Sequence, residues 1–267
     1  MDKIQRKRKE LLRRICTDMK SDNRYYHQSK EANTSIINDD YNILYCSIPK
    51  VGCTNWKRIF LVLSGVRNST LGIHHFAVHA HKYPTISRTE HRRQNYTSFL
   101  FVRHPFQRLL SAYRNKFEIP DNKAFVRTGR KIISLYRSYA TTKKYGNTLN
   151  PRVKFPEFVR FLLNSENKSS FNVHWDFQHK LCAVCDHSYD FIGHFENIVE
   201  ESNYFLHSIG VTNVSFPNFS THATNSSDEN IYLKYFSQIP PDDIIKLYEL
   251  YKMDFKLFGY PFPQELF

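Results

Sequence analysis

The sequence predicts an α/β fold in which helices flank a central parallel sheet. Two segments, residues 42–65 and 96–117, each contain an apolar run, a polar loop and an amphipathic helical pattern in that order. Such repeated units favour parallel pairing, because a crossover helix returns the chain to the same end of the sheet. The chain is 41% hydrophobic and 15% aromatic, which is enough for a sizeable core. We therefore predict one domain over residues 41–267.

The first unit follows a polar N-terminal region. Residues 1–40 are predicted to form a helix and then a linker or stem-like arm, because "MDKIQRKRKELLRR" is helix-like and residues 21–40 lack a sustained period. Residues 42–48, "NILYCSI", predict a buried strand. The next helix is predicted to end near Gly65, and its apolar residues recur at helical spacing: Trp56, Ile59, Phe60 and Leu63.

The second unit begins with a short apolar strand at residues 99–102. Pro105 stands where the first turn of a helix is expected, since proline suits that position. One face of this helix is apolar, as expected for packing on a core, and consists of Phe106, Leu109, Leu110, Tyr113 and Phe117. In parallel sheets ligands bind at the carboxyl ends of strands, where both "PKVGCTN" and "RHP" are expected to lie.

Weaker patterns predict the later elements. Residues 118–150 predict a helix and a basic loop, and "FPEFVRFLLN" predicts another helix with Pro156 at its start. A strand near residues 189–193 and a helix ending at Gly210 come next. Residues 211–230 predict a loop, because they are rich in Asn, Ser and Thr. The segment "PPDDIIKLYELYKMDFKLFGY" closes the chain as an amphipathic helix.

The chain is strongly basic, with 38 Lys and Arg against 25 Asp and Glu and a formal charge of +13. This charge favours an anionic partner: nucleic acid, anionic lipid, a polyanionic glycan or a phosphorylated cofactor. Apolar runs fall far short of the roughly 20 residues of a membrane span, and no signal peptide is visible. Taken alone, these two features favour the cytoplasm. Seven glycosylation sequons favour a lumenal protein instead, and the alternative is that several of them are accidental. The sequons lie at Asn33, Asn68, Asn95, Asn167, Asn213, Asn218 and Asn225.

The loop "PKVGCTN" combines features of an anion site. It joins a strand to a helix, whose first N–H groups and dipole attract phosphate or sulfate. Gly52 allows close backbone approach, Thr54 adds a hydroxyl and Lys50 adds an ammonium group. The plain alternative is a simple joint with a solvated lysine. The phosphate-loop pattern of nucleoside triphosphatases is absent, which disfavours an Mg-ATP site.

A second anion motif follows the second strand. Arg103 ends that strand and Ser111 falls in the second turn of the following helix, so that one phosphate can contact both. Taken singly, Arg103 is equally consistent with a structural ion pair, and Ser111 with helix packing. Together with the Lys50 loop, the two residues define two anion sites on neighbouring strands. A nucleotide phosphorylated at its 3′ and 5′ positions matches that arrangement.

These motifs resemble those of Golgi carbohydrate sulfotransferases. "IPKVGCTNWKR" is similar to their 5′-phosphosulfate loop, and "FLFVRHPFQRLLSAYRNKF" to their 3′-phosphate motif. The subgroup with chondroitin and dermatan 4-O-sulfotransferases and the HNK-1 sulfotransferase is the most similar. The likeness continues through "HW" at residues 174–175, "LCAVCDHSYDFIGHFE" and "LYELYKMDFKLFGY", and covers most of residues 42–260.

The resemblance implies a P-loop-like sulfotransferase fold, the donor 3′-phosphoadenosine 5′-phosphosulfate (PAPS) and a sugar hydroxyl of an anionic glycan as acceptor. It also implies a type II Golgi membrane protein, whose anchor this sequence lacks. Lys50 would neutralise the transferred sulfuryl group, while Arg103 and Ser111 would hold the 3′-phosphate. The 5′-phosphate would be held by the loop residues Val51, Gly52, Cys53, Thr54 and Asn55. The chemistry requires no metal.

Transfer to a hydroxyl requires a general base. The segment "GIHHFAVHAHKYP" supplies four histidines, and its Val-His element resembles one in the subgroup, so that His79 is the predicted base and His75 and His81 are its alternatives. A metal-binding surface or a solvated loop remains the plain alternative for this segment. His174 and Trp175 are predicted to line the acceptor site or, equally, to belong to the core.

The five cysteines are an odd number, so at least one is free or paired between chains. Cys182 and Cys185 have three interpretations: half of a zinc site, a redox pair, or a structural disulfide or two buried thiols. The last suits an oxidising lumen. Cys53 is interpreted as shaping the donor loop.

Other functions remain open from the sequence. The acceptor is predicted to be O-4 of N-acetylgalactosamine in chondroitin or dermatan, and the alternatives are a terminal glucuronic acid or an N-glycan sugar. Basic residues between 123 and 154 either follow an anionic glycan or form a solvated face. The alternative from another class is a non-catalytic polyanion-binding protein. A nucleic-acid partner is not expected, because neither a recognition fold nor a stacking platform is evident. A nucleotide kinase lacks its phosphate-loop lysine pattern and an Mg-binding carboxylate set.

Overall fold

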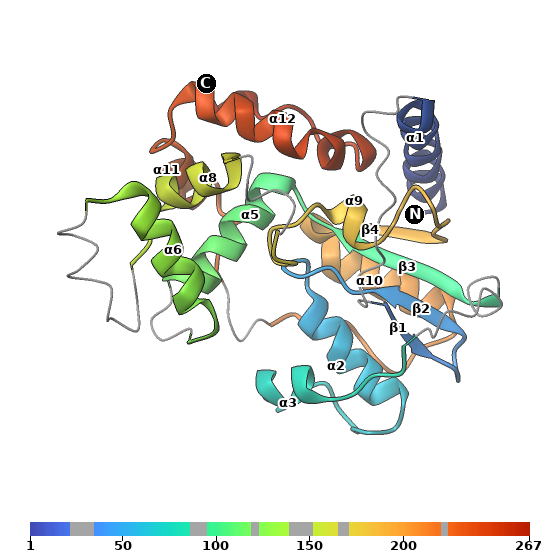
Figure 1. The fold of residues 1–267 in the computed structure, drawn as a ribbon. Coiled ribbons are helices and arrows are strands. Elements are labelled where there is room, and N and C mark those ends of the chain that lie inside the picture. The colour runs from blue at the N-terminus through green and yellow to red at the C-terminus, as the bar shows by residue number, and fades with distance from the viewer. Residues whose placement is uncertain (22–34, 86–94, 119–122, 139–151, 165–170, 220–223) are drawn as a thin grey trace. The chain divides into compact units, whose positions relative to one another are not determined.

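A computed structural model describes residues 1–21, 35–85, 95–118, 123–138, 152–164, 171–219 and 224–267. It is an α/β structure whose sheet is mixed and mostly parallel (Figure 1). The chain divides into two compact units. The first unit comprises Met1–His104, Asp176–Thr221 and Met253–Tyr260, and the second comprises Pro105–Trp175, His222–Lys252 and Pro261–Phe267. The predicted single domain over 41–267 stays a prediction.

The first unit contains a four-stranded sheet in the order β1-β2-β3-β4. The strands are β1 (Ser35–Asn38), β2 (Ile43–Cys46), β3 (Thr97–Val102) and β4 (Phe191–His194). β2, β3 and β4 pair in parallel, with Tyr45 opposite Phe99 and Phe99 opposite Phe191. The predicted parallel core of the sheet is confirmed. The antiparallel edge strand β1 is not anticipated by the sequence analysis, which placed residues 35–38 in an arm.

One face of the sheet is covered by aromatic packing with α2 (Cys53–Leu63) and α10 (Ile198–Ser208). Tyr45 stacks on Phe99 with ring centroids 4.8 Å apart. Phe99 in turn lies 4.6 Å from Trp56 of α2 and 4.2 Å from Phe205 of α10. These rings are buried. Tyr45 and Phe99 share a face of the sheet because residues directly opposite each other on neighbouring strands point the same way. The predicted apolar face of residues 56–63 is therefore the face that packs on the sheet.

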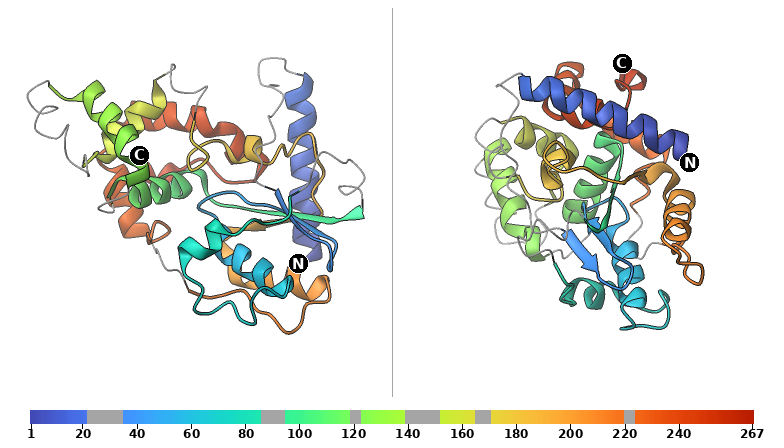
Figure 2. Two further views of the ribbon diagram at one scale, coloured as in Figure 1. Left: turned by 60° about the horizontal axis from the view of Figure 1, so that its bottom comes forward. Right: turned by 90° about the vertical axis from the view of Figure 1, so that its right-hand side faces the viewer.

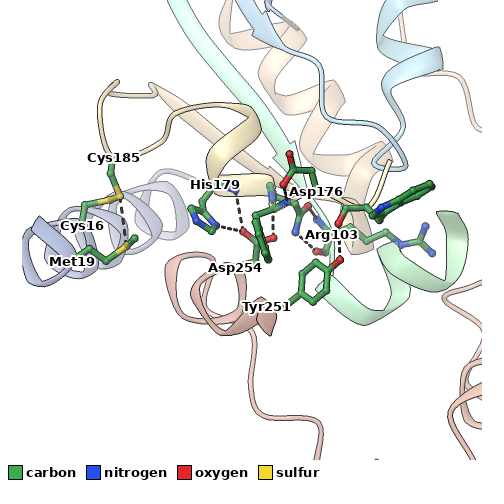
Figure 3. A network of polar contacts seen from close by, with 11 residues as sticks. Cys16, Met19, Arg103, Asp176, His179, Cys185, Tyr251 and Asp254 are labelled. Atoms are coloured by element: carbon green, nitrogen blue, oxygen red, sulfur yellow. Dashed lines mark hydrogen bonds and ion pairs between the residues drawn. A yellow bond between two sulfur atoms is a disulfide. The ribbon is translucent and has the colours of Figure 1, made fainter. Parts of the chain in front are cut away.

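Cys46 points to the opposite face of the sheet, because it follows Tyr45 in β2. Cys46 is bonded to Cys182. Cys16 of α1 (Asp2–Ser21) is bonded to Cys185, as Figure 3 shows. Cys182 and Cys185 are thus structural disulfide residues, but they do not pair with each other. Zinc binding and redox cycling between them are excluded while these bonds exist. Cys53 is the free cysteine.

α1 is packed against β4 through side chains spaced along one of its faces. The Gln5 side chain accepts from Ile192 N–H at 2.9 Å and donates to Ile192 C=O at 3.0 Å. Arg8 forms a two-pronged ion pair with Glu201 of α10, at 2.6 and 2.9 Å. The predicted N-terminal helix exists, and it belongs to the first unit. Figure 2 shows α1 along the sheet, on the side away from α2.

The second unit is helical around an aromatic core. Its helices are α5 (Pro105–Tyr113), α6 (Val126–Tyr136), α8 (Phe155–Leu163) and α11 (Glu229–Phe236). A π-helical turn, Arg114–Glu118, continues α5. The prolines predicted at helix starts are confirmed, since Pro105 begins α5 and Pro156 lies in the first turn of α8. Buried rings fill the interior, among them Phe106, Tyr113, Phe117, Phe158, Trp175 and Phe236.

Three further helices and three short 3₁₀ turns complete the described elements. α3 (His75–Ala80) follows α2, and α9 (Gln178–Leu181) precedes the cysteine segment 182–185. α12 (Pro241–Leu257) contributes to both units, with Met253 as the first residue of its part in the first unit. Three short 3₁₀ turns are Lys123–Phe125, Phe195–Asn197 and Gln264–Leu266. Among these described helices, none is both long and apolar enough to span a membrane.

Candidate functional site

The two predicted anion loops meet at one edge of the sheet. β2 and β3 run in parallel with Cys46 opposite Leu100, so the segments that follow these strands leave from their carboxyl ends together. Lys50 lies in the segment after β2, and Arg103 directly follows β3. The Arg103 guanidinium donates from Nη1 to the Lys50 carbonyl at 3.3 Å. The fold thus joins the two residues that the sequence analysis assigned to separate motifs.

The Lys50 loop has an unusual backbone. Lys50 and Gly52 both have positive φ angles, of 73° and 83°, on either side of the fully buried Val51. A Cβ atom on Gly52 would lie 2.3 Å from Cδ1 of Ile198, the first residue of α10. Glycine is therefore favoured here by its φ angle and by the available space. Gly52 caps α2, whose N-terminal dipole end faces the loop.

Not every predicted loop residue offers a side chain to a ligand. Val51 is buried in the core. Asn55 donates from its amide to the carbonyls of Pro217 and Phe219, each at 2.9 Å, and its own N–H donates to the Gly52 carbonyl. Asn55 therefore ties α2 to residues 217–219. Cys53 and Thr54 are half-buried in the first turn of α2.

Arg103 is only 4% exposed, and several groups set its orientation. Its guanidinium carbon lies 4.2 Å above the ring of Phe195. The Arg103 backbone N–H donates to the Gln178 side-chain oxygen at 3.0 Å. The Arg103 backbone carbonyl accepts from the Gln178 side-chain nitrogen at 2.9 Å. An arginine held in this way is a defined cation at the end of β3, next to the Lys50 loop.

His79, the predicted base, contacts the Lys50 loop. Its Nε2 lies 3.0 Å from the Thr54 hydroxyl, and its side chain is exposed on α3. The His75 ring is close by, with ring centroids 4.4 Å apart. His74 instead caps α3 by accepting from Phe76 N–H, and His81 contacts the Tyr83 ring. A hydroxyl both donates and accepts, so Thr54 can contact His79 and an anion together.

A neutral histidine follows Arg103. Burial, with Arg103 as the second cause, lowers the pKa of His104 to about 4. The Glu196 carboxylate accepts a hydrogen bond from the His104 backbone N–H at 2.8 Å and one from the Tyr260 hydroxyl at 2.9 Å. Burial, assisted by Arg8, also lowers the pKa of His194 to about 3. Both imidazoles are therefore neutral near pH 7 and add no positive charge beside Arg103.

Ser111 belongs to the second unit, where it is 3% exposed. Its hydroxyl lies 2.9 Å from that of Thr224, which also contacts the Ser226 hydroxyl at 2.9 Å. Arg114 donates to the Thr224 carbonyl. Three hydroxyls and a guanidinium therefore form one polar group within the helical unit. The assignment of Ser111 to the 3′-phosphate stays a prediction.

The predicted acceptor residues also lie in the second unit. Trp175 is 3% exposed and packs against Phe117, Phe125 and Phe158, while its carbonyl accepts from the Tyr251 hydroxyl at 2.6 Å. This burial favours the core alternative for Trp175. His174 is half-buried, and its Nδ1 lies 2.6 Å from the Asn172 side-chain oxygen. An acceptor role for either residue stays a prediction.

Comparison with known proteins decides the family. A model of the sulfotransferase family matches residues 33–261. The chain belongs to this sulfotransferase family. The matched range includes both anion loops, the histidine segment and the polar group around Ser111.

Several proteins that are similar to this sulfotransferase-family chain are named as carbohydrate sulfotransferases. It is 34% identical over 273 residues to carbohydrate sulfotransferase 8 of Mus musculus, covering 98% of this chain and 65% of the relative. It is 38% identical over 243 residues to carbohydrate sulfotransferase 11 of Rattus norvegicus, covering 86% and 68%. For carbohydrate sulfotransferase 14 of Danio rerio the values are 38% over 237 residues, covering 85% and 62%. The chain thus spans about two thirds of the length of these relatives. No solved structure matches it.

Several residues around the candidate site were not predicted from the sequence. Gln178 and Asp254 are fully buried polar residues linked to Arg103, and Phe195 lies under its guanidinium. Thr224 contacts Ser111 from a segment predicted only as a loop. No spacing or local pattern marks these residues, because each reaches its partner across the fold. The density of hydroxyl residues in 219–227 was the one available signal for Thr224.

Proposed function

We propose that this chain is a catalytic domain that transfers the sulfuryl group of PAPS to a sugar hydroxyl of an anionic glycan. The acceptor that we propose is O-4 of N-acetylgalactosamine in chondroitin or dermatan. The observation that carries the donor assignment is the contact between the Arg103 guanidinium and the Lys50 carbonyl. This contact places Lys50 and Arg103, the two cations expected to bind a bis-phosphate, at the same edge of a parallel sheet and at the start of a helix.

The proposed reaction is an in-line displacement at sulfur. The sugar oxygen forms a bond to sulfur as the bond from sulfur to the 5′-phosphate oxygen breaks, and adenosine 3′,5′-bisphosphate (PAP) leaves. Lys50 neutralises the charge on the transferred group and on the leaving oxygen, which lowers the barrier electrostatically. His79 accepts the proton of the sugar hydroxyl. The contact between His79 and Thr54 supports this role, because it holds the base beside the donor loop.

A Golgi lumenal location is part of the proposal. The two disulfides are typical of an oxidising compartment. The sequon asparagines of the described chain are exposed, namely Asn68, Asn95, Asn213, Asn218 and Asn225, as glycosylation requires. The relatives are named as carbohydrate sulfotransferases, which supports a glycan acceptor. The net charge of +13 supports an anionic one.

Lys50→Ala and Arg103→Ala test the donor site. We expect both variants to lose PAP affinity and sulfate transfer, because each removes a cation that faces a phosphate or the sulfuryl group. PAP binding is measured by titration calorimetry, and circular dichroism checks the fold. Arg67→Ala is the matched control, since it removes an exposed arginine beyond the far end of α2. Parent-like PAP binding by both site variants would refute the donor assignment.

A panel of acceptors tests the second half of the proposal. With radiolabelled PAPS we expect label in chondroitin and dermatan, and digestion of the product should locate sulfate at O-4 of N-acetylgalactosamine. Preferential labelling of a terminal glucuronic acid or an N-glycan would replace this acceptor and leave the donor chemistry intact. Glycan binding without any PAP binding or transfer would instead favour the non-catalytic polyanion-binding alternative.

A further inference from the structure

Gln178 replaces a missing strand partner at the end of β3. The ladder between β3 and β4 ends with Val102 opposite His194, so Arg103 is the first residue beyond it. The Gln178 side chain then supplies one acceptor and one donor to the Arg103 backbone, at 3.0 and 2.9 Å. In a sheet, a neighbouring strand supplies the same two hydrogen bonds, one to the backbone N–H and one to the backbone C=O of a residue. Since Gln178 is wholly buried, water does not compete for these two bonds.

Asp254 in turn holds Gln178. Its carboxylate accepts the Gln178 backbone N–H at 2.8 Å. It also accepts the His179 backbone N–H at 3.0 Å and lies 2.6 Å from His179 Nδ1 (Figure 3). The two N–H groups begin α9, where a helix leaves its donors without internal partners. Asp254 comes from the last turns of α12 and is wholly buried. The position of α9, and with it that of the Gln178 side chain, therefore depends on Asp254.

The chain of contacts ends at a cation. The Arg103 backbone is held by Gln178. The Arg103 guanidinium carbon lies 4.2 Å from the centroid of the Phe195 ring, and its Nη1 donates to the Lys50 carbonyl at 3.3 Å. A small rotation of the Arg103 backbone would move the guanidinium at the end of its long side chain by a larger distance. We infer that Gln178 and Asp254 are positioning residues that aim Arg103 at the 3′-phosphate and thereby set the selectivity for PAP over nucleotides without that phosphate.

This inference rests on the proposed function, because it takes the partner of Arg103 to be the 3′-phosphate. The plain alternative is that the network only stabilises the first unit. The two cases differ in one observable. A general loss of structure weakens all adenine nucleotides, whereas misdirection of Arg103 weakens only those that carry a 3′-phosphate.

The test compares PAP with adenosine 5′-monophosphate, which lacks the 3′-phosphate. Gln178→Met keeps the length of the side chain and removes both bonds, and Asp254→Asn keeps its shape and replaces one acceptor with a donor. We expect either change to lower PAP affinity by roughly tenfold, as the loss of a charge-assisted contact does, and to change the affinity for the monophosphate less than about twofold. With saturating acceptor, KM for PAPS should rise while kcat stays near the parent value.

Two further variants separate positioning from stability. Gln178→Glu retains the oxygen that accepts from Arg103 N–H and should show an intermediate selectivity. Asp190→Asn is the matched control, because the Asp190 carboxylate accepts the Ser98 N–H at 2.8 Å at the opposite end of β3. It should keep the parent ratio of the two dissociation constants even where its Tm falls. Selectivity is compared at temperatures equally far below each Tm.

The outcomes are distinguishable. If the parent binds PAP and the monophosphate equally, the donor assignment in the proposed function fails and the inference falls with it. If the parent is selective but Gln178→Met and Asp254→Asn weaken both nucleotides by the same factor, the network is only structural and the inference is wrong. If one variant does not fold, Gln178→Glu decides by the same ratio: a parent-like ratio overturns the inference and a reduced ratio supports it.

Discussion

His79 carries the sharpest assignment at the scale of single residues. Among the four histidines of residues 74–81, it contacts Thr54 of the Lys50 loop, at 3.0 Å. His75 and His81 remain the alternatives, and the His75 ring lies beside that of His79. The distance of a base from the loop matters, because proton transfer requires hydrogen-bond contact with the reacting hydroxyl.

For His79→Ala we expect PAP binding near the parent value and sulfate transfer slowed by roughly 100-fold or more, because the variant lacks the proton acceptor but keeps the loop. Binding is measured by calorimetry and transfer by a radiolabel assay. His74→Ala, at the cap of α3, is the matched control and should keep most of the activity. Unchanged turnover of His79→Ala would remove it as the base and direct attention to His75 and His81.

His104 is expected to make stability depend on pH. Burial and Arg103 lower its folded-state pKa to about 4, against an ordinary value of about 6.5. As pH falls from 6.5 to 4, the unfolded chain binds a proton that the folded chain does not, so stability decreases through this window and levels off below it. His194, with a pKa of about 3 through burial and Arg8, acts in the same direction. Together they destabilise the fold in acid.

For His104→Phe we expect a smaller loss of unfolding free energy between pH 6.5 and 4, by on the order of 3 kcal/mol at most. Phenylalanine retains the edge contacts of this ring with Phe255 and Tyr260 and does not titrate. Urea unfolding at several pH values measures the effect. A pH slope of His104→Phe equal to that of the parent would contradict the explanation.

At the scale of elements, α1 differs most from its prediction. The sequence placed it before the domain, whereas in the structure this helix packs against β4. It is held to the first unit by the Cys16–Cys185 disulfide, by Gln5 against Ile192 and by the Arg8–Glu201 pair. Glu201 also accepts the His194 N–H at 3.1 Å and has a side chain only 2% exposed. A carboxylate so buried depends on its arginine, because an unpaired buried charge is strongly unfavourable.

Arg8→Met should therefore lower the free energy of unfolding by about 3 kcal/mol, as removal of one member of a buried ion pair does. Arg6→Met on the exposed face of the same helix is the matched control and should change stability by less than about 0.5 kcal/mol. Chemical denaturation measures both. Equal effects of the two substitutions would show that α1 contributes through its disulfide rather than through this ion pair.

At the scale of the whole molecule, the positive charge is expected to govern the capture of the acceptor. The chain has 38 basic and 25 acidic residues, so it attracts long anionic glycans electrostatically. Added salt screens this attraction. We expect KM for chondroitin to rise severalfold between about 0.05 and 0.2 M salt. KM for a short uncharged acceptor with terminal N-acetylgalactosamine should change little. Salt-independent KM values for both would mean that the net charge does not act on the acceptor.

Local patterns predicted the main units because they depend on neighbouring residues. Apolar runs and helical periodicity identified β2, α2, β3 and α5, and Pro105 marked the start of α5. Gly52 and Lys50 pointed to a ligand loop before any contact was known. The short elements β1, α3, α9 and α11 were missed, since elements of this length form through tertiary packing rather than through their own propensity.

By itself, the sequence predicted the α/β fold class and the resemblance that the family match confirms, and it marked the two loops as candidate anion sites. Only the tertiary structure decided which cysteines pair, that Arg103 reaches the Lys50 loop, that His79 contacts Thr54, and that Asp254 and Gln178 lie behind Arg103. The reason is physical. Backbone propensities and periodicity act over a few residues and can be recognised locally, whereas a buried hydrogen bond joins residues that only the folded chain brings together.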